Sequence, residues 1–137
     1  MDADAAPAEP RKTVVLVIED DVVVRRTIVL FFTRAGYEVL EAGSAAEART
    51  QWDAHHARIT AVVSDNMLGV GSTGLSLLRQ FLIARATLPT VLISGVLTFD
   101  VMRNIETAST IRCLQKPFEF RDLVELVTRR TRELASV

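Results

Sequence analysis

Short apolar runs alternate with longer segments of helical periodicity five times along the chain. The first run, residues 14–18, is continuous and rich in β-branched residues, which is typical of a strand buried on both faces of a parallel sheet. The predicted strands cover 14–18, 37–42, 61–65, 90–93 and 111–114, and the predicted helices cover 22–35, 44 to about 55, 73–85, 98–107 and 119–134. This strict alternation predicts an α/β fold, in which one doubly wound, five-stranded parallel sheet carries helices on both faces.

Helix boundaries have recognisable residues. Asp21 stands where the first helix needs an N-cap, and Gly36 follows that helix as a C-cap signal. Ser44, with Glu47 three residues later, has the spacing of a capping box. In the third helix we expect the apolar positions Leu75, Leu78 and Leu82 to form the buried stripe.

Length and composition limit the class of protein. A chain of 137 residues suits one domain, and we expect a disordered tail over residues 1–12 followed by the domain over 13–135. The net charge of −1 gives no electrostatic footprint for nucleic acid, and no apolar run is long enough to span a membrane. Cys113 is the only cysteine, so no intrachain disulfide is possible. We therefore expect a cytoplasmic protein.

Charged and hydroxyl side chains follow four of the predicted strands. Glu19 and Asp20 come after the first, Asp65 ends the third, Ser94 ends the fourth and Lys116 follows the fifth. Because the carboxyl ends of parallel strands share one edge of the sheet, we expect these five groups to converge there. Each has an ordinary alternative, such as a helix cap, a turn residue or a surface lysine, but coincidence at four strand ends is hard to accept.

The converging groups are suited to phosphoryl transfer. Three crowded carboxylates repel one another unless a cation is present, and Mg²⁺ accepts several carboxylate oxygens while keeping water ligands. Asp65 is then the candidate nucleophile that accepts a phosphoryl group. Lys116 and the metal would neutralise the charge on that group, and the Ser94 hydroxyl would bond one of its oxygens.

Four motifs in this order resemble those of the receiver domain of two-component response regulators, including the chemotaxis regulators. They are Val17-Ile18-Glu19-Asp20, Ser64-Asp65, Ile93-Ser94-Gly95 and Gln115-Lys116-Pro117-Phe118. The resemblance covers residues 13–134. It implies a flavodoxin-like sheet of strand order 2-1-3-4-5, a phosphoryl group received on Asp65 from a sensor histidine kinase, and a cis peptide bond before Pro117.

The resemblance also implies ligands, switch residues and partners. Mg²⁺ would bind Glu19, Asp20, Asp65 and the backbone carbonyl of Met67. Ser94 and Cys113 occupy the switch positions, and the fourth helix, fifth strand and fifth helix form the switching surface, through which a homodimer is also possible. Expected partners are a sensor histidine kinase or a histidine phosphotransfer protein, and a downstream protein of unknown identity. Because such a domain catalyses only its own phosphorylation and dephosphorylation, we do not expect an enzyme in the usual sense.

Three features depart from the receiver pattern. The positions after Asp65 that usually hold a hydrophobic residue and proline are Leu68-Gly69, and Gly74 comes one residue later than usual, so we expect a mobile loop and uncertain metal affinity. Cys113 replaces an aromatic residue that normally swings inward, so we expect signalling to depend on the fourth helix, whose intrinsic helix propensity is low. Met67 and Val96, both apolar, flank the phosphoryl position and predict slow self-dephosphorylation.

Other functions remain open at this stage. A pseudo-receiver would bind a partner without ever taking phosphate, and the unusual loop keeps that alternative alive. With no room for an output domain after Leu134, we expect a stand-alone receiver or one excised from a hybrid histidine kinase. A phosphatase that uses an aspartyl phosphate typically needs a second carboxylate where this chain has Met67. A flavin site is disfavoured because the acidic loop after the first strand would repel phosphate.

Overall fold

The computed structural model describes residues 13–69, 73–95, 99–108 and 110–135. In chain order its elements are β1 (Val14–Ile18), α1 (Val22–Arg34), β2 (Glu38–Ala42), α2 (Ala45–His55), β3 (Ala61–Asp65), α3 (Gly74–Ala84), β4 (Thr90–Ser94), α4 (Phe99–Ala108), β5 (Ile111–Gln115) and α5 (Phe120–Ala135). All ten predicted elements are present, and their ends lie within one residue of the predicted ones. The predictions of a disordered tail over 1–12 and of an apolar Val96 beside the phosphoryl position lie outside the described residues.

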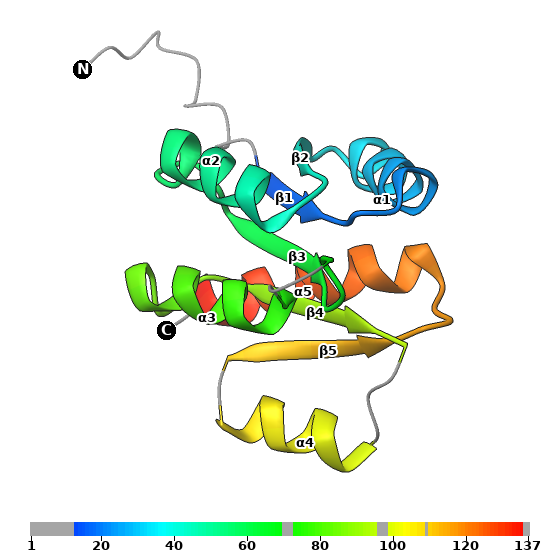
Figure 1. Cartoon of the computed structure of the whole chain (residues 1–137), viewed down its shortest axis with the longest axis vertical. Coiled ribbons are helices and arrows are strands. Elements are labelled where there is room, and N and C mark those ends of the chain that lie inside the picture. Colours follow the sequence, from blue (N-terminus) through cyan, green and yellow to red (C-terminus); the bar gives the residue numbers. More distant parts are fainter. Residues whose placement is uncertain (1–12, 70–72, 96–98, 109, 136–137) are drawn as a thin grey trace, which may run out of the picture.

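The five strands form one sheet in the order β2-β1-β3-β4-β5, and all neighbouring pairs are parallel (Figure 1). The predicted α/β fold and the strand order 2-1-3-4-5 are therefore confirmed. From β1 the chain continues first to β2 on one side and then to β3 on the other. The carboxyl ends of β1 and β3 consequently border the point where strand order reverses, which is where open α/β sheets bind their ligands.

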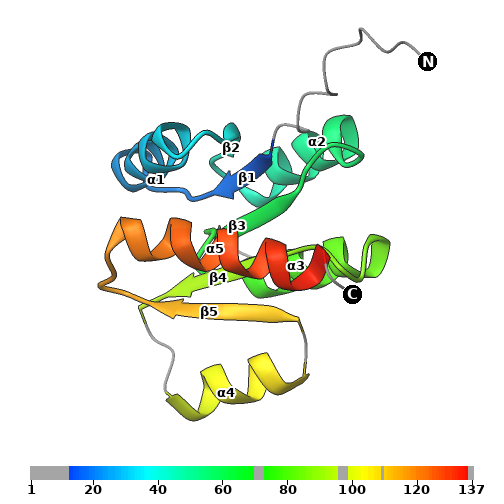
Figure 2. The ribbon, with the colours of Figure 1, turned by 180° about the vertical axis from the view of Figure 1, so that it is seen from behind.

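Strand side chains alternate between two apolar layers, one on each face of the sheet. Leu16, Val62 and Leu92 face the layer built with α2, α3 and α4. Their neighbours Val17 and Val63 face the opposite layer, built with α1 and α5. Figure 1 shows α2 and α3 over one face, Figure 2 shows α1 and α5 over the other, and α4 lies beside the edge strand β5. Burial on both faces explains why β1 is continuously apolar and why β3 begins with the apolar residues 61–63.

Predicted caps are present at the helix ends. The Asp21 carboxylate accepts hydrogen bonds from the backbone N–H groups of Val23 and Val24, and the Ser44 hydroxyl accepts one from Glu47 N–H. Glu47 closes the box one residue earlier than expected, because its carboxylate accepts from the N–H of Gly43. Gly36, with φ of 96°, takes the left-handed conformation after α1.

The predicted buried stripe of α3 is partly wrong. Leu78 is buried, but Leu75 and Leu82 are only half-buried, and Leu77 and Phe81 take the inner positions instead. The segment has apolar residues on most of its circumference, so its periodicity does not select a single face. Tertiary packing does, because the Phe81 ring stacks on Trp52 of α2 with a centroid separation of 4.4 Å.

Candidate functional site

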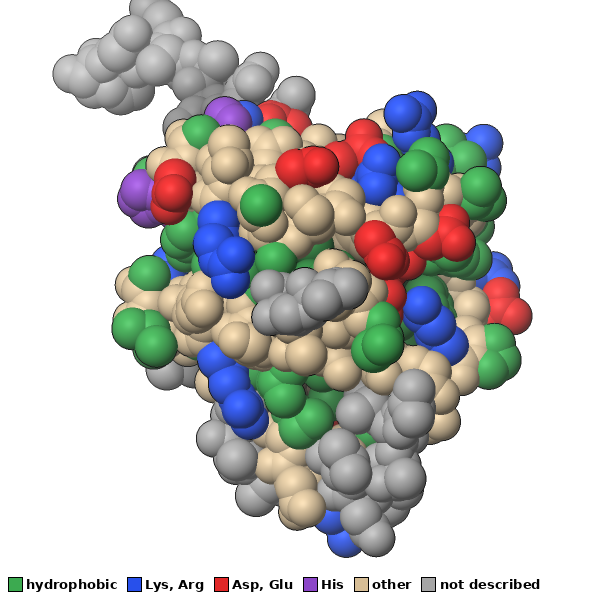
Figure 3. All heavy atoms as spheres, in the orientation of Figure 1, with side chains coloured by type: hydrophobic (Ala, Val, Ile, Leu, Met, Phe, Trp, Pro, Cys, Tyr) green, Lys and Arg blue, Asp and Glu red, His purple; other side chains and the backbone are tan. Residues whose placement is uncertain are grey.

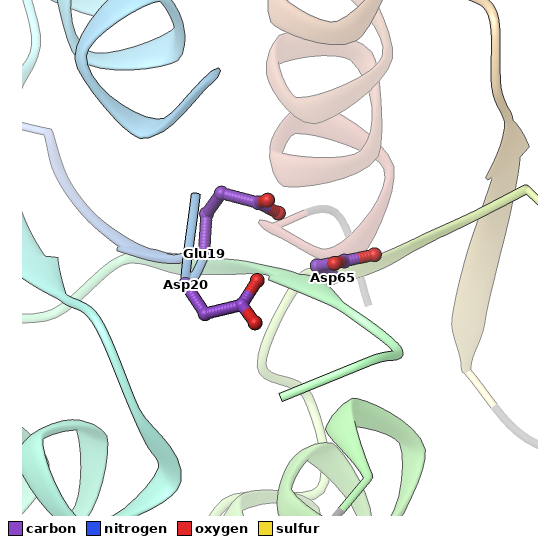
Figure 4. A group of neighbouring side chains, drawn as sticks. All are labelled: Glu19, Asp20 and Asp65. Atoms are coloured by element: carbon purple, nitrogen blue, oxygen red, sulfur yellow. The ribbon is translucent and has the colours of Figure 1, made fainter. Parts of the chain in front are cut away.

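Three carboxylates meet at the carboxyl edge of the sheet. Glu19 and Asp20 follow β1, Asp65 ends β3, and Figure 4 shows the side chains of Glu19 and Asp20 extending toward Asp65. Each offers a ligand atom that lies within 4.8 Å of those of the other two. Glu19 and Asp65 are buried, at 2% and 4% exposure, whereas Asp20 is exposed. Figure 3 shows acidic side chains gathered at this side of the molecule, with basic side chains close by.

Lys116 brings the positive charge that the sequence predicts for this edge. Its Nζ atom lies 3.4 Å from Oδ1 of Asp65, and its backbone N–H donates to the carbonyl of Ser94. Ser94 is buried at the end of β4, in register with Gln115 of β5. The peptide bond between Lys116 and Pro117 is cis, as the resemblance implies. The five groups expected at this edge therefore stand on strand ends that meet there.

The charge of the pocket is unbalanced. The pKa of Glu19 is raised to about 7, mainly by burial and also by the negative charge of Asp65 and a hydrogen bond with the Asp65 side chain. The positive charge of Lys116 and the hydrogen bond from the Asp21 N–H act in the opposite direction. One ammonium thus stands against three carboxylates in a partly dehydrated site. This donor set fits a hard divalent cation, because all its ligand atoms are carboxylate oxygens and the exposed side at Asp20 leaves room for water ligands.

The loop after Asp65 is held at the ends that the structure describes. The Asn66 N–H donates to the Ile93 carbonyl, and the Asn66 side chain accepts a hydrogen bond from the N–H of Leu75. Met67 forms an isolated antiparallel bridge with Thr73, and the residue is 64% exposed. In this bridge the N–H of Gly74 donates to the carbonyl of Asn66, and not to that of Met67, the predicted metal ligand. Residues 70–72, at the centre of the predicted mobile loop, lie outside the described part.

Gly74 has a role at the site that its position in the sequence did not reveal. A Cβ atom at Gly74 would lie 2.0 Å from the carbonyl oxygen of Asp65 and 2.7 Å from the hydroxyl of Ser64. The first turn of α3 therefore packs directly on the backbone of the candidate nucleophile. In the structure Gly74 directly follows Thr73, whose hydroxyl caps α3 by accepting from the Ser76 N–H, and no sequence pattern assigns the contact between Gly74 and Asp65.

Cys113 occupies its predicted switch position as a buried core residue. Its side chain belongs to the apolar layer on the α2–α3–α4 face, and burial is the main cause that raises the pKa of its thiol to about 11. Its backbone N–H donates to the carboxylate of Glu106, 3.2 Å away on α4. That carboxylate satisfies a donor on the outer side of the edge strand, a contact that the sequence does not indicate.

Comparison with known proteins agrees with this geometry. The family described as the response regulator receiver domain matches residues 15–128. The chain belongs to this family. No curated protein matches the chain.

Solved structures with the same fold include several receiver domains. One is a receiver domain protein from Clostridium thermocellum, with 20% identity, a TM-score of 0.81 and coverage of 90% of this chain and 98% of that one. A second is the receiver domain of the hybrid histidine kinase CckA, with 28% identity, a TM-score of 0.71 and coverage of 86% and 98%. A third is the CheX-CheY-BeF3-Mg complex from Borrelia burgdorferi, with 18% identity, a TM-score of 0.76 and coverage of 85% and 87%.

Membership of this family makes the chain a receiver domain of two-component signalling. Such domains interact with histidine kinases or phosphotransfer proteins and generally bind Mg²⁺ at an acidic pocket. Among the helices that the structure describes, none combines the length and hydrophobicity needed to cross a bilayer.

Proposed function

We propose that this receiver domain takes a phosphoryl group from a histidine of a sensor kinase or phosphotransfer protein onto Asp65. The observation that carries the proposal is the approach of three carboxylates to within 4.8 Å, with Lys116 Nζ 3.4 Å from Asp65. A carboxylate oxygen of Asp65 attacks phosphorus, and the bond between phosphorus and the donor nitrogen breaks. The products are an aspartyl phosphate and a free histidine.

Residues around Asp65 have distinct parts in this reaction. The ammonium of Lys116 neutralises negative charge as it develops on the phosphoryl oxygens, and the Ser94 hydroxyl donates a hydrogen bond to one of them. Glu19, Asp20, Asp65 and the carbonyl of Met67 would hold Mg²⁺. When bound, the cation supplies charge neutralisation and orientation for the transferring group. Burial of Asp65 excludes water from its carboxylate, which favours transfer to the protein.

Phosphorylation is proposed to change a docking surface formed by α4, β5 and α5. This surface contains the open edge strand and a groove of about 530 Å³ lined by both signs of charge, including Arg112, Asp122 and Arg129. It would bind the downstream protein or a second copy of the chain. Because the domain would catalyse only its own phosphorylation and dephosphorylation, we class it as a signalling domain of the cytoplasm rather than as an enzyme.

The identity of 28% with the receiver of a hybrid histidine kinase supports a second candidate. In that case the chain is a receiver from a hybrid kinase, and its phosphoryl group passes onward to a histidine phosphotransfer protein. Transfer from the phosphorylated domain to a phosphotransfer histidine, followed on a radiolabelled gel, would support this candidate. Retention of the label on Asp65 would favour a response regulator that acts by docking.

Intact-protein mass spectrometry after incubation with Mg²⁺ and acetyl phosphate tests the main proposal. Wild type should gain one phosphoryl group, and Asp65→Asn should gain none because the amide is a poor nucleophile. Asp53→Asn is a matched control, since Asp53 is an exposed carboxylate on α2. If wild type gains no group from acetyl phosphate or from a phosphorylated sensor kinase, the chain is a pseudo-receiver that signals by binding alone.

A further inference from the structure

Arg25 on α1 joins the loop that carries the two β1 carboxylates to the neighbouring strand. Its Nη1 donates to the backbone carbonyl of Glu19 at 2.9 Å, and its Nε lies 3.2 Å from Oε1 of Glu41 on β2. The Arg25 side chain is only 15% exposed. A guanidinium is planar and presents its donors in a fixed fork, so these two bonds together fix its orientation.

The backbone of Glu19 is thereby held from both sides. Its N–H donates to the carbonyl of Ala42 at the end of β2, and its carbonyl accepts from Arg25. The space for the guanidinium is also closely bounded, because a Cβ atom at Gly43 would lie 2.9 Å from Nη1. Elements β2 and α1 therefore jointly fix the residue from which one metal-facing carboxylate projects.

A cation beside a cation-binding pocket is unfavourable on electrostatic grounds alone. Pairing with Glu41 offsets the charge of Arg25, while the hydrogen bond to the Glu19 carbonyl is kept. The arrangement retains the geometric effect of the guanidinium and reduces its repulsion of a metal ion. This combination favours a role in orienting the loop rather than in altering the potential of the pocket.

We propose that Arg25 is a positioning residue that orients Glu19 and Asp20 for binding of a divalent cation. The inference rests on the proposed function, since it requires that the acidic pocket bind Mg²⁺. Residues that orient metal ligands through hydrogen bonds typically contribute about tenfold or more to metal affinity. Arg25 does so through the backbone of a ligand rather than through its carboxylate.

Positioning and electrostatics predict opposite results for Arg25→Met. Loss of the hydrogen bond to the Glu19 carbonyl should weaken Mg²⁺ binding by about tenfold. Loss of the positive charge alone would instead strengthen binding, by about twofold for a partly screened charge. Arg25→Lys separates the two effects, because lysine keeps the charge but cannot reproduce the fork, so positioning predicts weaker binding here as well.

Glu41→Gln provides a converse test. The amide oxygen of glutamine can still accept the bond from Arg25 Nε, so positioning predicts affinity within about twofold of wild type. Arg26→Met is the matched control, because Arg26 is the adjacent arginine on α1 and its side chain is exposed. It loses the same charge from the same helix, so its Mg²⁺ affinity should remain near that of wild type or rise slightly.

Isothermal titration with Mg²⁺ measures these affinities, and amide hydrogen exchange over residues 19–24 in metal-free protein gives a second readout. Weaker binding and faster exchange in both Arg25 variants, with Arg26→Met binding at least as tightly as wild type, would support the inference. Tighter or unchanged binding in Arg25→Met, with wild type binding normally, would overturn it and leave the proposed function intact. Absence of binding by wild type would reject the metal site itself, and the inference with it. Thermal unfolding of each variant verifies that it is folded.

Discussion

Replacing Gly74 by alanine sets helix propensity against steric exclusion at the candidate site. Alanine is favoured over glycine within a helix by about 1 kcal/mol, so propensity alone predicts a more stable protein. The new Cβ atom would lie 2.0 Å from the Asp65 carbonyl oxygen, about 1.4 Å closer than the 3.4 Å at which van der Waals contact becomes ordinary. A second overlap, at 2.7 Å, involves the hydroxyl of Ser64.

Neither side of this contact can yield easily. Asp65 lies on β3, which is paired on both sides by β1 and β4, and its carbonyl oxygen is a backbone atom. Relief therefore requires a shift of α3, whose inner face is held by Leu77, Leu78 and Phe81. Overpacking typically costs about 1–3 kcal/mol of unfolding free energy. Because the clashing atom belongs to the backbone, we expect a loss of about 3 kcal/mol, at the upper end of this range. That is a large part of the stability of a typical domain.

Urea unfolding measured by tryptophan fluorescence tests this prediction. Trp52 is the only tryptophan, and it stacks on Phe81 of α3, so its emission reports on the helix that must move. Gly95→Ala is the matched control, because its Cβ atom would meet nothing closer than the Lys116 Cβ at 3.9 Å. We expect Gly74→Ala to lose stability and to phosphorylate more slowly, with Gly95→Ala within about 0.5 kcal/mol of wild type. Equal or greater stability of Gly74→Ala would refute the steric argument.

Three further predictions follow from charge and burial. In the folded protein the pKa of Glu19 is raised from 4.5 to about 7, so the folded state binds a proton on this carboxylate more tightly than the unfolded state does. The free energy of unfolding of the metal-free protein should therefore fall by about 3 kcal/mol as the pH rises from 4.5 to 7. Urea unfolding in EDTA should show this loss in wild type but not in Glu19→Gln, and equal slopes would contradict it. Because the pKa of the Cys113 thiol is raised to about 11, its alkylation by iodoacetamide at pH 8 should be about 100-fold slower than that of a free cysteine. Mass spectrometry measures the rate, and rapid labelling of the native protein would refute the burial of Cys113. Because the apolar side chain of Met67 cannot orient an attacking water, the aspartyl phosphate of the wild type should persist in Mg²⁺ buffer. Met67→Glu should shorten the lifetime of this phosphate, and a half-life of seconds for the wild-type aspartyl phosphate would reject the reasoning.

The fold and the charged groups of the site could be predicted because each depends on local pattern. Short apolar runs identified β1 and β3, and the carboxylates at the carboxyl ends of these strands, Glu19 and Asp65, were identified with them. Once strands alternate with helices, topology brings the carboxyl ends to one edge without any further information from the side chains. The carboxylates and the lysine were therefore predictable from one sequence, whereas the strand order came from the resemblance to a family and was then confirmed.

The contacts of Arg25 and the buried face of α3 could not be predicted, because they depend on how separate elements pack against one another. Arg25 and Arg26 are adjacent on the same helix, and no pattern separates the one that bonds the Glu19 carbonyl from the exposed one. The buried stripe of α3 was misassigned for a similar reason, because the stacking of Phe81 on Trp52 decides which apolar face turns inward. Such choices are made by tertiary contacts, and propensity and periodicity do not contain them.

The hydrogen bond between Cys113 of β5 and Glu106 of α4 suggests how this receiver would switch without the aromatic residue that Cys113 replaces. In place of a large side chain that swings, Cys113 fills the core and offers its N–H to Glu106 of α4 at 3.2 Å. A displacement of α4 that carries Glu106 away from β5 would break this bond and expose a donor on the edge strand, which would then be satisfied by water or by a partner. A switch based on α4 would therefore change the docking surface at β5 directly, without a side chain that moves through the core. Signalling through α4 stays a prediction, and this bond is the contact on which it depends.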